Sequence, residues 1–219
     1  MKASILNNIE QSVELPNLLR ELNDFREGEQ NKRAAFYDWV KPDVKAEFIN
    51  GEIIVHSPVR SRHYLVTKWM QKILDTHVEL HHLGYLGCEK IMCRFPRNDY
   101  EPDLCFFDRA QTQNIGDSTT IFPIPRFVAE VLSASTEQRD RGVKFEDFER
   151  NGVGEYWIVN ATDNLLEQYI LNGGRYEQAV ILAPGNTLDS PTFPNLNVDL
   201  AVFFDGAANL LALQDLLNG

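Results

Sequence analysis

The chain has 219 residues, of which 43% are hydrophobic and 24% are charged, and its formal net charge at pH 7 is −11. This composition is typical of a globular protein with one sizeable core, and it excludes a disordered or low-complexity chain. The negative charge, taken alone, argues against a protein that coats nucleic acid non-specifically, because such proteins are usually basic.

The cysteines and the N-terminal sequence bear on the expected cellular location of the protein. Cys88, Cys93 and Cys105 are an odd, scattered set, so we expect no disulfide framework and a cytoplasmic location. The N-terminus lacks the basic flank and apolar segment of a signal peptide. No apolar run approaches the roughly 20 residues needed to span a bilayer, so we expect no membrane partner.

The first predicted element is a helical arm. Residues 1–30 are polar apart from Leu15, Leu18, Leu19 and Leu22, whose spacing predicts one short amphipathic helix. We interpret residues 31–219 as a single domain. At its start, Asn50-Gly51 separates two β-prone runs and predicts a hairpin over residues 46–55. Apolar residues at helical spacing then predict a helix of about four turns from Tyr64 to His77.

The remaining elements alternate strands with helices. We predict strands over 86–95, 102–108 and 127–132, a helix over 136–150 that ends at Asn151-Gly152, and a strand over 156–159. A second hairpin is predicted from 166–171 and 175–180. Residues 188–204 are predicted to be irregular or extended, and 209–217 form a terminal helix. This order predicts an α/β fold, with a mixed central sheet flanked by helices and with added β-hairpins.

Glu130 is the most informative residue, because every neighbour in the run from Phe127 to Leu132 is apolar. Burying a carboxylate costs several kcal/mol unless a charge, a metal or strong hydrogen bonds compensate it. A metal site explains such an acid. A structural ion pair or a position at the sheet edge would also explain it.

Asp103 follows Pro102 and begins another apolar strand. Carboxylates on two adjacent central strands can bind one hard cation, and Mg²⁺ takes one or two carboxylates together with waters and substrate phosphate. Asp103 and Glu130 are therefore the candidate ligands for Mg²⁺ or Mn²⁺. For Asp103 considered alone, an Asx turn that caps the strand is the simpler interpretation.

Three other residues are candidates for the same site. Lys144 shares a helix face with Asp140 and Phe148, which could direct its ammonium at the metal site to hold the attacking water. It could equally be an exposed lysine paired with Asp140, in which case Arg139 or Arg141 would supply the cation. Glu52 follows the first hairpin turn and could reach the metal through water. His63, with Arg60 and Arg62, could contact phosphate, although a histidine at a helix start is more often a surface or core residue.

The order of these motifs resembles the Uma-type restriction endonuclease family of the PD-(D/E)XK nuclease superfamily, which is abundant in cyanobacteria. The resemblance covers about residues 34–171, and it is carried by residues 47–55, His63, Pro102-Asp103-Leu104, residues 129–133, Asp140, Lys144 and residues 154–159. It implies a restriction-endonuclease-like core with Asp103, Glu130 and the backbone carbonyl of Val131 as metal ligands. The superfamily lysine lies two positions after the acid, where this chain has Leu132, so the resemblance assigns that role to Lys144.

The sequence leaves several functions open. The leading hypothesis is an Mg²⁺-dependent or Mn²⁺-dependent endonuclease that hydrolyses phosphodiester bonds in DNA, and such proteins often act as homodimers. A non-catalytic binding or regulatory module that retains the nuclease fold is the alternative, favoured by the negative charge and by Leu132. A zinc site from His81, His82, Cys88 and Cys93 is a minor third reading, because its spacing matches no known zinc motif. The segment 56–97 carries a net charge of +4, which is consistent with either a nucleic-acid-binding patch or a solvated helix face.

Overall fold

A computed structural model of the chain describes residues 8–218. Its centre is a mixed sheet whose strands lie in the order β11-β10-β9-β8-β6-β3, with β12 also paired to β10. The strands are β3 (Gly84–Cys88), β6 (Leu104–Asp108), β8 (Phe127–Val131), β9 (Glu155–Asn160), β10 (Leu165–Asn172), β11 (Arg175–Tyr176) and β12 (Val180–Leu182). β8 and β9 are parallel, and the other pairs are antiparallel. The mixed sheet flanked by helices is therefore confirmed.

A smaller sheet lies beside the central one, in the order β2-β1-β5-β4-β7. It contains β1 (Ala46–Ile49), β2 (Glu52–Val55), β4 (Met92–Arg94), β5 (Asp99–Tyr100) and β7 (Ile121–Phe122). The predicted first hairpin is present, and its turn residues Asn50 and Gly51 have φ of 53° and 84°, as a type I′ turn requires. The predicted strand over 86–95 is wrong, because it divides between the two sheets. Positive φ at Glu89 and Lys90 turns the chain from β3 to β4.

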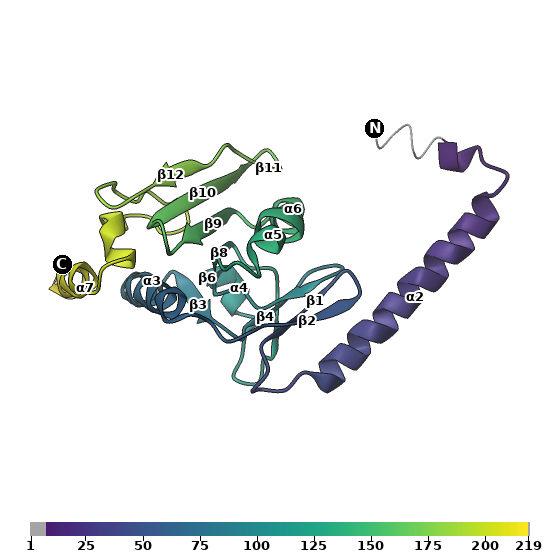
Figure 1. The fold of residues 1–219 in the computed structure, drawn as a ribbon, viewed down its shortest axis with the longest axis horizontal. Coiled ribbons are helices and arrows are strands. Elements are labelled where there is room, and N and C mark those ends of the chain that lie inside the picture. Colours follow the sequence, from purple (N-terminus) through teal and green to yellow (C-terminus); the bar gives the residue numbers. More distant parts are fainter. Residues whose placement is uncertain (1–7, 219) are drawn as a thin grey trace.

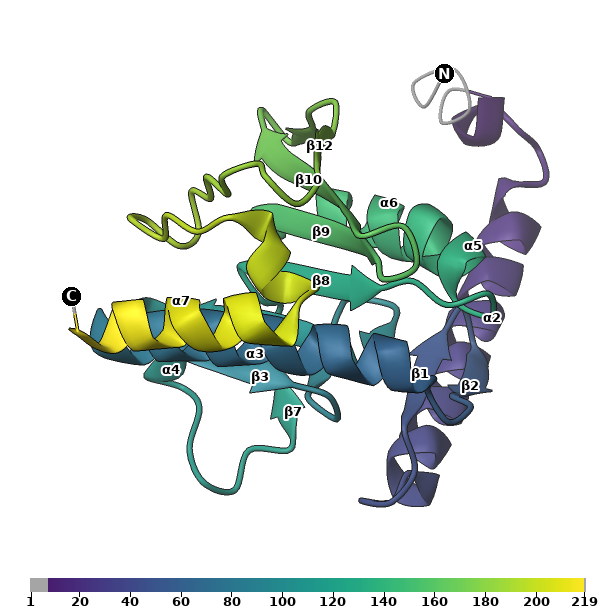
Figure 2. The ribbon, with the colours of Figure 1, turned by 60° about the vertical axis from the view of Figure 1, so that its left-hand side comes forward.

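Helices cover both faces of the central sheet (Figures 1 and 2). The long helix α3 (Ser61–Leu80) packs with α7 (Gly206–Asn218) and the 3-10 turn η2 (Leu200–Phe203) on one face. The other face carries α5 (Glu137–Arg139), the π turn η1 (Asp140–Lys144) and α6 (Phe145–Arg150), and the short α4 (Arg109–Thr112) follows β6. The predicted single helix over 136–150 is thus three segments, with a π turn in the middle.

The alternation of side chains along the central strands separates two cores. Phe127, Ala129 and Val131 of β8 face α3, whereas Val128 belongs to the second core with Phe148 and Tyr156. Glu130 lies on the same side of β8 as Val128, because side chains alternate along a strand. It therefore faces α6 and η1 rather than α3. The fold therefore directs this acid into the space between the central sheet, η1 and β1.

The N-terminal helix is longer than the sequence predicted. α2 (Leu15–Trp39) has 25 residues, and its first half extends away from the sheets (Figure 1). Its second half is attached through Phe36, which is fully buried against Phe48, and through Arg33, which binds the buried Asp99 at 2.6 Å. No helix within residues 8–218 is long and apolar enough to cross a membrane.

Candidate active site

Asp103 and Glu130 face each other across two neighbouring strands. Strands β6 and β8 are antiparallel, with Leu104 opposite Ala129 and Cys105 opposite Val128, so the same register continued by one residue sets Asp103 opposite Glu130. Both residues are 4% exposed. The backbone N–H of Val131 donates to Oδ2 of Asp103 at 2.9 Å, which ties the two strand ends together. The structure thus brings these two predicted carboxylates to one place.

Lys144 reaches this pair from η1. The π turn directs both Asp140 and Lys144 inward, where each is 1% exposed. Nζ of Lys144 lies 2.8 Å from Oε1 of Glu130, 2.9 Å from Oε1 of Glu47 and 3.4 Å from Oδ1 of Asp140. The pairing of Lys144 with Asp140 therefore exists, but both side chains are buried rather than exposed. Three buried acids therefore surround one ammonium, which donates a hydrogen bond to Glu130.

Glu47 is one member of the site that the sequence reasoning missed. It lies on β1 and is completely buried, and its Oε2 is 3.0 Å from Nε2 of His56. Its Oε1 also accepts the N–H of Glu101. Glu47 occupies an apolar strand, Ala46 to Ile49, as Glu130 does. The same rule that identified Glu130 would have identified Glu47.

Glu52 lies outside this group. It is exposed at the beginning of β2, beyond the turn that joins β2 to β1, and it does not line the cleft described below. The register of the hairpin places Glu52 opposite Ile49, whereas Glu47 is opposite Ile54. The structure therefore does not bring Glu52 to the predicted metal site, because the inward-facing acid of this hairpin is Glu47 on the first strand.

A lysine and a histidine hold Asp103. Nζ of Lys45 lies 2.9 Å from Oδ1, and Nε2 of His63 lies 3.1 Å from Oδ2. Burial alone would raise the pKa of Asp103, but the hydrogen bond from His63 and the charge of Lys45 outweigh it and hold this pKa well below its usual range. The structure thus places His63, at the start of α3, beside Asp103 in the cleft. Lys45 gave no local signal, because it precedes β1 in an ordinary polar context.

Glu130 has the opposite electrostatic environment. Burial raises its pKa well above the usual range, and although the charge of Lys144 opposes this rise, the charges on Asp140, Asp103 and Glu47 add to it. Four buried carboxylates (Glu47, Asp103, Glu130 and Asp140) face only two lysines, Lys45 and Lys144, so negative charge is in excess when the histidines are neutral. An added cation would relieve this repulsion.

The site opens into a cleft of about 540 Å³. Asp103 and Glu130 line it together with Lys45, His56 and His63, whereas Lys144 lies behind Glu130 and does not line it. Its outer wall contains Arg60, Arg139 and the segment from Val131 to Glu137. Nε of Arg139 is buried and has no hydrogen-bond partner among the described residues. The cleft therefore has acids at its floor and basic side chains at its rim.

Arg62 also borders the cleft, but its guanidinium is already used by the fold. It donates to the carbonyl oxygens of Ala161 and Phe204 at 3.0 and 2.9 Å and to Oδ1 of Asn164 at 2.6 Å. These bonds fasten the start of α3 to the β9–β10 turn and to η2. Of the two predicted arginines, only Arg60 has no such bond in the described part of the chain.

The donor set fits a hard divalent cation. Mg²⁺ and Mn²⁺ prefer oxygen ligands, and a catalytic Mg²⁺ site needs only one or two carboxylates, completed by water and phosphate. Asp103 and Glu130 supply these. Oδ1 of Asp103 bonds to Lys45 and retains a second lone pair, whereas Oδ2 already contacts both His63 and the N–H of Val131. Within residues 8–218 no three His, Cys, Asp or Glu side chains form a closed metal-binding group, so the zinc reading finds no support. Cys93 is buried and lies beside Cys105.

Comparisons with known proteins identify the family and the fold. A family model described as "Uma2: Putative restriction endonuclease" matches residues 33–202. The chain is also similar to a crystal structure described as a "putative nuclease belonging to DUF820" from Anabaena variabilis ATCC 29413, with a TM-score of 0.68 and 17% sequence identity over 80% of this chain and 96% of that chain. This likeness confirms the restriction-endonuclease-like fold. No curated protein matches the chain.

Proposed function

The chain belongs to the Uma2 family of restriction-endonuclease-like proteins, and from this membership we propose that it is a metal-dependent endonuclease that hydrolyses phosphodiester bonds in DNA. The observation that carries the proposal is the opposition of Asp103 and Glu130 on adjacent strands, both buried, at the floor of an open cleft. Buried carboxylates whose charge exceeds that of the neighbouring cations destabilise the folded protein. In a metal site the bound cation offsets this repulsion.

Asp103, Glu130 and the backbone carbonyl of Val131 are the proposed ligands of Mg²⁺ or Mn²⁺. When bound, such an ion polarises the scissile phosphate and lowers the pKa of a water molecule. Lys45 and His63 hold the carboxylate of Asp103 in place, and both line the cleft. We assign to Lys45 the stabilisation of the charge that develops on the phosphate, because its Nζ is at the cleft floor.

Lys144 acts through Glu130 in this proposal. It lies behind the cleft wall, and its Nζ is 2.8 Å from Glu130, 2.9 Å from Glu47 and 3.4 Å from Asp140. We therefore assign it a positioning role: it orients the carboxylate of Glu130, which in turn orients the attacking water. Glu47 and Asp140 are positioning residues in the same sense, since they hold Lys144.

A non-catalytic module that retains the fold is the second candidate. The engagement of Lys144 by three carboxylates favours it, because the superfamily chemistry uses a lysine close to the water. The net charge of −11 also opposes general binding to DNA. This candidate predicts that the purified protein binds a partner in the cleft and cleaves no nucleic acid.

Cleavage assays separate the two candidates. Supercoiled plasmid DNA should be nicked or linearised in Mg²⁺ or Mn²⁺ and should stay intact in EDTA. Asp103→Asn and Glu130→Gln should each abolish the activity, whereas Glu52→Gln on the exposed part of the hairpin should leave it unchanged. Cleavage that persists in EDTA or in both site variants would refute the proposed site, and no cleavage under any metal condition would favour the binding module.

A further inference from the structure

The basic residues between positions 56 and 97 fall into two groups. Four are tied to the fold: Arg62 as described above, Lys90 to the carbonyl oxygen of Lys41 at 3.1 Å, Arg94 to the hydroxyl of Tyr37 at 3.0 Å, and Arg97 to Glu29 at 2.9 Å. The other three, Arg60, Lys68 and Lys72, are exposed and form no salt bridge with any residue in the range 8–218. The basic segment of the sequence thus reduces to three unpaired cations.

These cations follow one helix. Arg60 is the N-cap of α3, and Lys68 and Lys72 lie on later turns of the same helix. Tyr64 lies between them with 53% of its surface exposed, and Nζ of Lys68 is 6.0 Å from the centre of its ring. Arg60, Tyr64, Lys68 and Lys72, which we call the α3 ridge, recur every four residues, about 6 Å along the helix axis.

The α3 ridge begins at the candidate active site. Arg60 lines the cleft that contains Asp103 and Glu130, and Tyr64, Lys68 and Lys72 line an adjoining groove of about 450 Å³. Glu89, on the opposite wall of this groove, binds Lys45 at 3.1 Å, and Lys45 in turn binds Asp103. The ridge is therefore a continuous basic and aromatic path that leads out of the cleft along α3.

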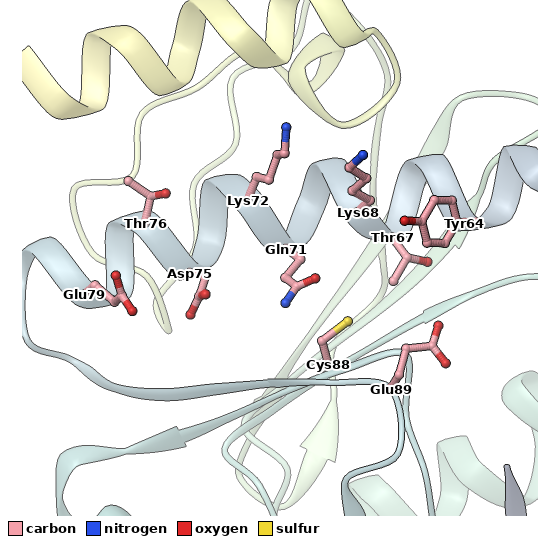
Figure 3. Close-up of a pocket in the computed structure, with 10 residues that line it drawn as sticks. All are labelled: Tyr64, Thr67, Lys68, Gln71, Lys72, Asp75, Thr76, Glu79, Cys88 and Glu89. Carbon is pink, nitrogen blue, oxygen red and sulfur yellow. The ribbon is translucent and has the colours of Figure 1, made fainter. Parts of the chain in front are cut away.

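The groove below the ridge has the opposite charge. Figure 3 shows Lys68 and Lys72 on one side of α3, with Gln71, Asp75 and Glu79 on the other side. The carboxylates of Asp75, Glu79 and Glu89 would repel phosphate from the groove floor. A polyanion that leaves the cleft would therefore follow the side of the helix that carries Lys68 and Lys72.

We propose that the α3 ridge binds an unpaired DNA strand that continues from the scissile phosphate in the cleft. Arg60, Lys68 and Lys72 would contact successive parts of the backbone, and Tyr64 would stack against one base. Unpaired strands are bound in this way, by cations along the backbone and by exposed aromatic rings that accept any base. In a duplex the faces of the bases are stacked and cannot reach Tyr64, so stacking on this ring favours a single strand. The inference rests on the proposed function. It adds that the substrate strand is unpaired and that it leaves the cleft along α3.

Binding measured in EDTA tests the ridge without cleavage. The probe is a fluorescent single-stranded DNA oligonucleotide, compared with its duplex, and the readout is anisotropy over a series of salt concentrations. Lys68→Gln/Lys72→Gln should weaken binding to the single strand and reduce the salt slope by about 1.4, roughly 0.7 for each cation. Arg109→Gln/Arg150→Gln has the same net charge at exposed positions on other helices and should keep the wild-type slope. Equal slopes for the two double variants would overturn the proposal.

Tyr64 provides a second test. Tyr64→Ala should weaken binding to the single strand at least about fivefold, whereas Tyr64→Phe keeps the ring and should stay close to the wild type. Neither change should alter duplex binding or the melting temperature, because the side chain is largely exposed. If Tyr64→Ala binds the single strand as the wild type does, or if the wild type does not bind it, the inference is wrong.

The two proposals can fail separately. Metal-dependent cleavage by the wild type, with unchanged single-strand binding in the ridge variants, would overturn the α3 ridge and leave the nuclease assignment intact. Ridge-dependent binding of the single strand, with no cleavage in Mg²⁺ or Mn²⁺, would support the ridge and favour the binding module.

Discussion

Lys144 and Glu130 form a buried ion pair, with Nζ 2.8 Å from Oε1, although 14 residues separate them in the sequence. The pair is not isolated, because Glu47 and Asp140 also contact the same ammonium. Burial lowers the pKa of Lys144, but the charges of Glu130, Glu47 and Asp140 outweigh it and raise this pKa well above its usual value. The lysine therefore stays charged, and no single acid is its only partner.

Glu130→Gln should leave the melting temperature of the metal-free protein unchanged or raise it. Its carboxylate repels three neighbouring acids, and Lys144 keeps Glu47 and Asp140 as partners after the change. Thermal melts should also show that Mg²⁺ stabilises the wild type, because the ion binds only the folded state, and does not stabilise the variant. A much lower melting temperature for the variant, with no metal response in the wild type, would mean that Glu130 is structural.

Lys144→Met should destabilise the protein by about 3–5 kcal/mol, because it leaves buried carboxylates without their cation. Urea unfolding measures this change. Lys68→Met, which removes an exposed lysine, is the matched control and should cost little. The double variant Lys144→Met/Glu130→Gln should recover part of the loss, since it removes one of the stranded charges. A single variant as stable as the control would contradict the buried network.

Glu47→Gln should destabilise the protein near neutral pH, in contrast to Glu130→Gln. Burial raises the pKa of Glu47, but the charge of Lys144 and the hydrogen bond with His56 outweigh it and lower this pKa to about 2 from 4.5. A carboxyl whose pKa is lowered by folding stabilises the protein above its unfolded pKa, here by about 3 kcal/mol. That contribution should disappear as the pH falls from about 4.5 toward 2. Glu52→Gln, at an exposed position of the same hairpin, is the control and should change the stability little. A pH-independent difference for Glu47→Gln would exclude this explanation.

Deletion of residues 1–30 should lower the stability of the remaining chain by no more than about 1 kcal/mol, the usual value of an exposed ion pair. The deletion removes the pair between Glu29 and Arg97 but retains Arg33 and Phe36, which attach α2 to the sheets. Arg33→Ala is the contrasting variant: it strands Asp99, whose side chain is fully buried, and should cost several kcal/mol. Unfolding of the truncated chain would show that the expected domain, 31–219, is not independent of the arm.

The sequence by itself singled out Asp103 and Glu130, but not Glu47, and it predicted most of the surrounding helices and strands. Glu130 was visible because a carboxylate in an apolar strand is costly wherever the strand lies, and Asn50-Gly51 encodes its hairpin in two residues. The same local rule, applied to Ala46–Ile49, would have revealed Glu47 in place of Glu52. Lys144 was accessible through its helical spacing from Asp140 and through the family resemblance.

Only the tertiary structure decided which side chains meet these acids. Lys45 lies 58 residues before Asp103 and binds it because the smaller sheet packs beside the central one. The bonds of Arg62 to Ala161 and Phe204 depend on the return of the chain at β9 and η2, so a local basic motif could not show that this arginine is occupied. The free-energy cost of burying a charged side chain can be inferred from the residue and its own strand. The partners that offset this cost lie on other elements, which only the sheet order and register bring together.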